Sequence, residues 1–129
     1  MIFTGTEKEK YFVEKIRSLM KNKSISVVGS TLQEYFSIIK NAYFVLCIDT
    51  SAQHIAAALN VPVVSIFSAG DKRIWHPYSK NSVAIQNMKV CISCMKDHCN
   101  IKGKRHLECV RSISNEYILE KVDKLMRVK

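Results

Sequence analysis

The sequence predicts an α/β fold: a Rossmann-like parallel sheet with flanking helices, formed as one domain over residues 1–129. Two short apolar segments, 43–48 and 63–67, have the composition of strands buried on both faces of a parallel sheet. Segments with helical spacing of apolar residues alternate with such strands, as in successive β-α-β units. Since 47% of the residues are hydrophobic and 24% charged, the composition excludes a disordered chain.

The first forty residues are expected to hold a helix, a strand and a second helix after a short apolar start at 2–4. The segment 24–28 is short and rich in β-branched residues, which predicts the strand. The helix over 7–21 would have an inner face made of Phe12, Ile16, Leu19 and Met20. Thr31 and Glu34 have the spacing of a capping box, so a second helix begins there. Its inward residues would be Leu32, Tyr35, Phe36 and Ile39.

The alternation continues after the strand at 43–48 with an alanine-rich helix that is expected to end at Asn60. The strand at 63–67 follows, and then a loop over 68–79. The weaker apolar segment 82–86 can form a fifth strand.

The last part of the chain combines an irregular tract with a closing helix. Residues 87–111 are polar, basic and rich in cysteine, without a clear period. The hydroxyl of Ser114 can cap a helix over about 114–126. The inner face of this helix would be formed by Ile118, Val122 and Leu125.

The formal net charge of +9 is unevenly distributed. Residues 1–70 carry 7 basic and 5 acidic side chains, whereas residues 71–129 carry 13 basic and 6 acidic ones. A basic second half suits an anionic partner such as nucleic acid, a phosphorylated ligand or an anionic membrane surface. A solvated lysine-rich face explains the same charge without a partner, so charge alone does not decide the function.

Several classes of protein are excluded by missing sequence features. No apolar run approaches the roughly 20 residues of a membrane-spanning helix, and the N-terminus lacks the order of a signal peptide, so we expect a cytoplasmic protein. The sequence contains no P-loop, no G-x-G-x-x-G and no G-x-S-x-G motif. ATPases with a P-loop, dinucleotide-dependent dehydrogenases and α/β-hydrolases are therefore not supported.

Candidate ligand-binding residues follow three predicted strands, because ligands of open α/β sheets bind beyond the carboxyl ends of the strands. These loops are Gly5-Thr6-Glu7, Gly29-Ser30-Thr31 and Asp49-Thr50-Ser51. The third loop brings hydroxyl groups to a helix N-terminus, whose N–H groups favour a phosphate. Simple N-capping of that helix is the alternative that needs no ligand. His54, in the first turn of the helix, is either a packed residue or a ligand contact.

Four cysteines form a second candidate site: Cys91, Cys94, Cys99 and Cys109. Four thiols within twenty residues are enough for a tetrahedral zinc site, although their spacing differs from the two C-x2-C pairs of a zinc ribbon. Disulfides are the weaker alternative in a reducing cytosol. A metal knuckle at these cysteines could bind nucleic acid through nearby basic side chains, which are Lys96, Lys102, Lys104 and Arg105.

These motifs together resemble the C-terminal half of family 9 glycosyltransferases, the heptosyltransferases, over Phe3 to Met126. The strongest stretch is 44–81, where the family pattern is an apolar strand, Asp-Thr-Gly-x-x-His, an alanine-rich helix, Pro-Val-Val and Trp-x-Pro, and this chain has Asp-Thr-Ser-x-x-His in the second place. The cysteine tract is also similar to one found in many members. The resemblance implies half of a GT-B architecture, whose C-terminal domain binds the nucleotide-sugar donor.

By the same resemblance, the donor-binding residues are Glu7, Ser30, Thr31, Asp49, Thr50, Ser51 and His54. Asp49, Thr50 and Ser51 correspond to the loop that binds the donor diphosphate. Glu7 falls where a family glutamate binds the ribose, and the backbone at Ser30 and Thr31 falls where the family meets the adenine. The chain departs from the family at Ser51, which replaces a glycine, and at 68–72, which replaces Gly-x-Thr-Asp-Pro.

The resemblance further implies an inverting transfer of heptose from ADP-heptose to the core of lipopolysaccharide, with no required cofactor and a structural zinc ion as an option. The acceptor domain and its general base are absent from this sequence, so the domain is expected to be incomplete and inactive alone. A glycolipid acceptor would bind through that missing domain or a partner chain. The expected location is cytoplasmic, at or near the inner face of an anionic membrane.

Two other functions stay open on the sequence. A basic module that is stabilised by zinc and binds nucleic acid would explain the charge and the cysteines, but not the order of the family motifs. A degenerate remnant that keeps the fold and binds no ligand would explain the substitution at Ser51.

Overall fold

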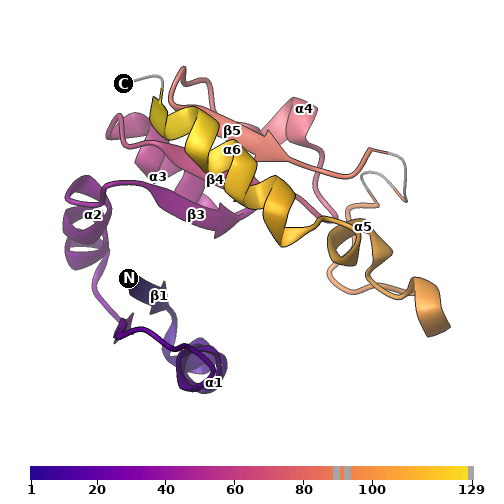
Figure 1. The fold of residues 1–129 in the computed structure, drawn as a ribbon, viewed down its shortest axis with the longest axis horizontal. Helices are drawn as coiled ribbons and strands as arrows, with labels where there is room; N and C mark the ends of the chain where they lie inside the picture. Colours follow the sequence, from indigo (N-terminus) through magenta and orange to yellow (C-terminus); the bar gives the residue numbers. More distant parts are fainter. Residues whose placement is uncertain (89–90, 92–93, 128–129) are drawn as a thin grey trace. The chain divides into compact units, whose positions relative to one another are not determined.

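The computed structural model of the chain describes residues 1–88, 91 and 94–127, and its strands and helices alternate as the sequence predicts (Figure 1). The elements follow in the order β1 (Ile2–Gly5), α1 (Lys10–Ser18), β2 (Ile25–Val28), α2 (Leu32–Lys40), β3 (Val45–Ile48), α3 (Ser51–Ala58), β4 (Val63–Ile66), α4 (Lys72–Trp75), β5 (Ser82–Ile85), α5 (Glu108–Arg111) and α6 (Asn115–Arg127). Two short 3-10 turns lie at Glu7–Glu9 and Gly103–Arg105. The chain divides into two compact units, Met1–Ile38 and Ile39–Lys129, which are described separately.

The first unit contains the parallel strand pair β1–β2, helix α1 and most of helix α2. β1 pairs with β2 from Ile2 opposite Ile25 to Gly5 opposite Val28. The buried residue of α1 is Val13, which lies next to Gly5. The expected inner face of this helix is therefore wrong: Phe12 is 63% exposed, and Ile16 and Leu19 are also exposed. Two four-residue strands cover only a narrow strip of the helix surface, and that strip falls at Val13.

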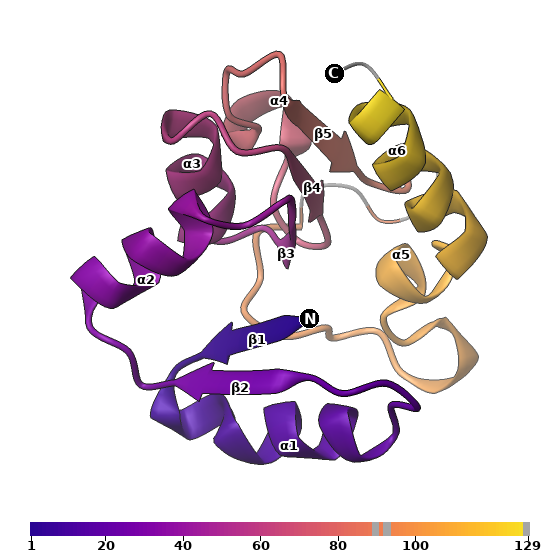
Figure 2. The same cartoon turned by 60° about the vertical axis from the view of Figure 1, so that its left-hand side comes forward.

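The second unit contains a parallel three-stranded sheet in the order β3-β4-β5. Figure 2 shows α3 and α6 on opposite sides of this sheet. The central strand β4 is buried on both faces, as predicted, with Val63 and Val64 fully inaccessible. The same prediction is wrong for β3, where Leu46 and Ile48 are exposed. Among the described strands, β3 pairs only with β4, so it is an edge strand that buries one face.

Several helix ends lie where local signals in the sequence predict them. The capping box at the start of α2 is present, since Glu34 Oε2 accepts hydrogen bonds from the Thr31 N–H and hydroxyl at 2.8 Å each. Asn60 ends α3 with a left-handed φ of 58°. Ser114 Oγ accepts a hydrogen bond from the Tyr117 N–H at 3.2 Å, which caps α6.

The predicted inner faces of α2 and α6 are buried to different degrees. In α2, Ile39 is buried, but Leu32 and Phe36 are exposed, so only one end of the expected face is covered. In α6, the three predicted inner residues are half-buried.

Two segments expected to be irregular contain short helices. α4 lies within the loop 68–79, and α5 lies within the tract 87–111. Positions 89–90 and 92–93 of that tract lie outside the described residues. Within the described part of the chain, no helix has the length and apolar character needed to cross a membrane.

Candidate functional site

In the first unit, Glu7 lies at the turn that holds Ser30 and Thr31. Gly29 ends β2 with a left-handed φ of 69°, and a Cβ at this position would collide with the Glu7 carboxyl group. The Thr31 N–H and hydroxyl are both held by Glu34 in the capping box. Thr31 therefore shapes the turn, and the turn presents the side chains of Glu7 and Ser30 to a ligand.

In the second unit, the loop Asp49-Thr50-Ser51 leads directly into α3, but it does not cap the helix with a side chain. Thr50 is the N-cap residue, and its hydroxyl points back to the Ile48 carbonyl at 3.4 Å. Asp49 Oδ1 instead accepts a hydrogen bond from Gln53 Nε2 at 2.8 Å. Because no side chain of the described residues makes an N-cap hydrogen bond at Thr50, the capping alternative does not explain this loop.

The carboxylate of Asp49 lies against a glycine from the next loop. A Cβ at Gly70 would collide with Asp49 Oδ2, so only a residue without a side chain leaves room for it. Gln86, just after β5, fixes this loop by donating from Nε2 to the Gly70 carbonyl at 2.6 Å. Its Oε1 accepts from the Lys72 N–H at 3.2 Å. The position of Asp49 therefore depends on residues that follow three different strands.

Sequence reasoning did not select Gln53, Gly70 or Gln86. Two sequence signals could have indicated the glutamines: Gln53 lies inside an alanine-rich helix, and Gln86 lies at the end of an apolar strand. Gln53 is fully buried, and its Oε1 has no hydrogen-bond partner among the described residues. A buried amide oxygen without a donor costs free energy, so Gln53 is not explained by packing alone.

Basic side chains gather near the start of α3. His54 is exposed in the first turn of the helix, and His76 is half-buried directly after α4. The pKa of His76 is lowered below its ordinary value, mainly by burial and additionally by the positive charges of Lys72 and His54. Lys72 and His54 would favour a nearby anion, whereas burial opposes the charged form of His76. Asp71, by contrast, has a structural role, because it caps α4 at the Arg73 N–H and pairs with the Arg73 guanidinium.

The lowered pKa of His76 predicts that the protein loses stability in mild acid. Below the ordinary value of 6.5, the unfolded chain binds a proton at this histidine before the folded chain does, so stability falls as the pH drops from 6.5 toward the folded pKa. Urea unfolding of His76→Gln between pH 7.5 and 5 should show a flatter dependence on pH than the wild type. His98→Gln, at an exposed position, should keep the wild-type dependence. An unchanged profile in His76→Gln would contradict the prediction.

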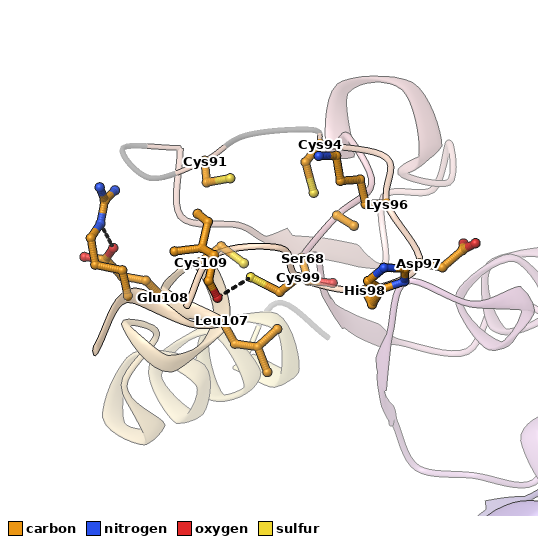
Figure 3. A pocket seen from close by; sticks show the side chains of 13 residues that line it. Ser68, Cys91, Cys94, Lys96, Asp97, His98, Cys99, Leu107, Glu108 and Cys109 are labelled. Atoms are coloured by element: carbon orange, nitrogen blue, oxygen red, sulfur yellow. Dashed lines mark hydrogen bonds and ion pairs between the residues drawn. The ribbon is translucent and has the colours of Figure 1, made fainter. Parts of the chain in front are cut away.

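The four cysteines of the basic tract surround one cavity of about 120 Å³ (Figure 3). Ser68 and Ala69, directly after β4, line the same cavity. All five cysteines of the chain are free thiols. The fifth, Cys47, lies apart in β3, and its pKa is raised to about 12 by burial and by Asp49.

The cavity brings together the predicted ligand set, but the presence of an ion stays a prediction. The pKa of the Cys109 thiol is raised, mainly by burial and also by the neighbouring thiols of Cys91, Cys94 and Cys99. As the side chains stand, no three potential ligands within the described residues are arranged to hold a metal ion.

Comparison with known proteins identifies the family. The sequence profile of glycosyltransferase family 9 (heptosyltransferase) matches residues 1–105. Lipopolysaccharide heptosyltransferase 3 of Escherichia coli is 38% identical over 53 residues, which make up 41% of this chain and 16% of that protein. This chain thus spans only a small part of that relative.

Two solved structures share the fold. The glycosyl transferase family 9 protein from Veillonella parvula DSM 2008 aligns with 99% of this chain and 36% of its own, with a TM-score of 0.81 and 17% identity. The E. coli ADP-heptose lps heptosyltransferase II aligns with 97% of this chain and 35% of its own, with a TM-score of 0.74 and 18% identity. These matches confirm the α/β fold predicted for a glycosyltransferase domain. The chain belongs to glycosyltransferase family 9, the heptosyltransferase family.

Proposed function

We propose that this chain forms the donor-binding part of a heptosyltransferase and that its donor is ADP-heptose. The observation that carries the proposal is the start of α3, which follows the edge strand β3 without an N-cap hydrogen bond from any described side chain. The N-terminal N–H groups of an eight-residue helix, with hydroxyl groups beside them, suit the diphosphate of a nucleotide sugar. ADP-heptose appears in the name of one of the proteins that share the fold.

The loop before α3 supplies side chains of different roles. Thr50 and Ser51 carry hydroxyl groups that can donate to phosphate oxygens, and Ser51 is exposed at the first turn. Asp49 would be repelled by a phosphate, so its carboxylate, which accepts from Gln53 and lies against Gly70, is better suited to accept a hydrogen bond from a hydroxyl group of the donor, such as one on the ribose that ADP also carries. His54, with the positive charge of Lys72, would offset the charge of the diphosphate.

The first unit, taken by itself, offers groups that can bind a nucleoside. The Glu7 carboxylate can accept hydrogen bonds from ribose hydroxyl groups. The turn at Ser30 offers a polar contact for the base, while Thr31 contributes by shaping the turn through its capping box. Binding of the donor in this way requires no cofactor.

Transfer itself would need groups from outside this chain. An acceptor hydroxyl must lose its proton to a base, and the departing diphosphate must be stabilised. The start of α3 can provide the second of these. Because this chain spans about a third of the solved structures, we assign the base and the glycolipid site to a further domain or a partner chain, and expect no transfer by this chain alone. The acceptor would be the core of lipopolysaccharide, and the configuration at the sugar would invert.

Titration calorimetry with ADP, GDP and UDP tests the proposed donor site. We expect saturable binding of ADP, and an affinity near millimolar, roughly −4 kcal/mol, would suffice for a part of the enzyme. Asp49→Asn and Thr50→Val should each weaken binding about tenfold or more, since hydrogen bonds to charged groups contribute about 1.5–3 kcal/mol. Asp123→Asn, an exposed change on α6, is the matched control and should bind ADP like the wild type.

The same titration tests the other candidates. Nucleotide binding that is equal in Asp49→Asn and the wild type would place the site elsewhere. Binding of a short DNA duplex with a steep salt dependence, and none of ADP, would favour the nucleic-acid module. We also propose that the protein is cytoplasmic and that its basic tract lies at the inner membrane face, and binding to vesicles that contain phosphatidylglycerol tests the second of these statements. That binding should weaken when four cations of the tract are replaced by alanine: Lys96, Lys102, Lys104 and Arg105.

A further inference from the structure

We infer that the loop around α4, residues 71–80, is a membrane anchor that inserts Ile74, Trp75 and Tyr78 into the interface of an anionic phospholipid bilayer. This α4 loop lies between β4 and β5, within the second unit (Figure 1). The inference deepens the proposed position at the inner membrane face, because it names the side chains that would enter the lipid. It makes no use of the proposed donor site, so it can be tested without a nucleotide.

Three large apolar side chains of the α4 loop are exposed to solvent. Ile74 is 70% exposed and Trp75 is 47% exposed. Tyr78 is 109% exposed, so its ring protrudes as freely as in an isolated residue. Single exposed apolar residues are ordinary on a protein surface, but three within five positions form a patch that favours an interaction. Because the patch protrudes, it does not have the concave shape of a site for a small molecule.

The backbone of the α4 loop is fixed at both ends, which holds these side chains in place. The N–H groups of Ile74 and Trp75 both donate to the Asp71 carbonyl at 3.0 Å. At the other end, Ser82 Oγ donates to the Pro77 carbonyl at 3.1 Å. Asp71 and Pro77 are themselves buried. A loop that is already ordered loses little conformational entropy when its exposed side chains bind a surface.

The charge around the patch suits anionic lipid headgroups. The α4 loop carries one acidic side chain, Asp71, and three basic ones, which are Lys72, Arg73 and Lys80. Asp71 is buried and pairs with the Arg73 guanidinium, whose side chain is still 68% exposed. Lys80 is exposed at the other end of the loop. Tryptophan and tyrosine close to basic side chains are typical of the boundary between lipid headgroups and acyl chains.

The outer face of α6 differs from the α4 loop in charge, although it also exposes apolar side chains. Leu119 is 62% exposed there. Glu116 and Asp123 lie three positions before and four positions after Leu119, so both neighbour it on the helix surface. Both carboxylates are exposed, and an anionic lipid surface would repel them. Leu119 is therefore the matched control for the apolar residues of the α4 loop.

Tryptophan fluorescence of the full chain tests the anchor directly, because Trp75 is the only tryptophan in the sequence. Vesicles of phosphatidylcholine mixed with phosphatidylglycerol should shift its emission to shorter wavelengths, and the shift should saturate with lipid. Vesicles of phosphatidylcholine alone should shift it far less. Lipids brominated on their acyl chains should quench the same emission. This quenching needs no variant, so the inference stays testable if a substitution prevents folding.

Substitutions that keep Trp75 as the probe test the neighbouring residues. Ile74→Ser and Tyr78→Ser should each weaken partitioning into the anionic vesicles about tenfold, because each removes a large apolar group that the lipid would bury. Lys80→Gln should weaken it about fivefold, since it removes one basic charge near the headgroups. Leu119→Ser should partition like the wild type.

The inference is wrong if anionic vesicles leave the Trp75 emission unchanged, if Ile74→Ser partitions like the wild type, or if Leu119→Ser loses as much affinity as Ile74→Ser. A shift that follows protein concentration without lipid would assign the patch to a second copy of the chain. Quenching by a single-stranded oligonucleotide without lipid would assign it to nucleic acid. Either result would overturn the anchor. Vesicle binding that depends on the basic tract 87–111 but leaves Trp75 in water would also overturn it, while the proposed membrane position would stand.

Discussion

Replacing Phe67 with alanine is expected to lower the free energy of unfolding by about 3–5 kcal/mol, the usual cost of removing a buried aromatic ring. Phe67 follows β4 directly and is fully inaccessible to solvent. Its N–H donates to the Ile85 carbonyl at 2.8 Å, so the backbone at this position is held in the sheet and cannot easily close the cavity. Since a domain of this kind has a total stability of about 5–15 kcal/mol, the loss is a large part of it.

Urea denaturation followed by circular dichroism measures this effect. Phe12→Ala is the matched control, because Phe12 is 63% exposed on α1. The control should change stability by about 0.5 kcal/mol or less, as surface substitutions usually do. If the two variants lost equal stability, the sheet around β4 would not be the main core of the second unit.

Replacing Gly70 with alanine is expected to weaken donor binding as strongly as a change at Asp49 itself. The new Cβ would collide with Asp49 Oδ2, and the Asp49 side chain would have to leave the position where it accepts from Gln53. If Asp49 contacts the donor as proposed, ADP affinity should fall at least tenfold, which corresponds to about 1.4 kcal/mol. Calorimetric titration with ADP measures the change.

Two further variants separate this effect from a general loss of structure. Gly103→Ala places a Cβ in open space and, although its φ of 70° makes the substitution strained, should leave ADP affinity unchanged. Gly70→Ala combined with Asp49→Asn should bind ADP about as weakly as either single variant, because both changes act through one carboxylate. Additive losses in the double variant would show that Gly70 acts independently of Asp49.

The fold class and several helix ends could be predicted from the sequence because their causes are local. A β-branched or continuous apolar run favours a strand, and the Thr31–Glu34 pair satisfies the backbone groups of its own helix terminus. Asn60 and Ser114 act within their own turns in the same way. The motifs in 44–81 likewise indicate the family, because they depend only on the order of residues along the chain.

Burial was harder to predict, because it depends on which neighbours an element has. The apolar runs of β3 and β4 look alike in sequence, yet β4 is central and β3 is an edge strand among the described residues. The helical spacing of α1 indicated an inner face but not its position, which was set by the narrow strand pair beside it. Periodicity shows that an element has an apolar face; pairing and packing decide whether that face is covered.

For the candidate sites, the order of residues alone indicates the family, the loops that follow the strands, and the four cysteines of the tract. The folded arrangement is needed to show that Gly70 makes room for the Asp49 carboxylate, that Gln86 fixes the Gly70 loop, and that the four cysteines surround one cavity. The reason is physical: the first two arrangements join residues that follow different strands, and their contact follows from the order of the strands in the sheet. The cavity at the cysteines depends on how the tract folds back on itself, and no local pattern of side chains encodes either feature.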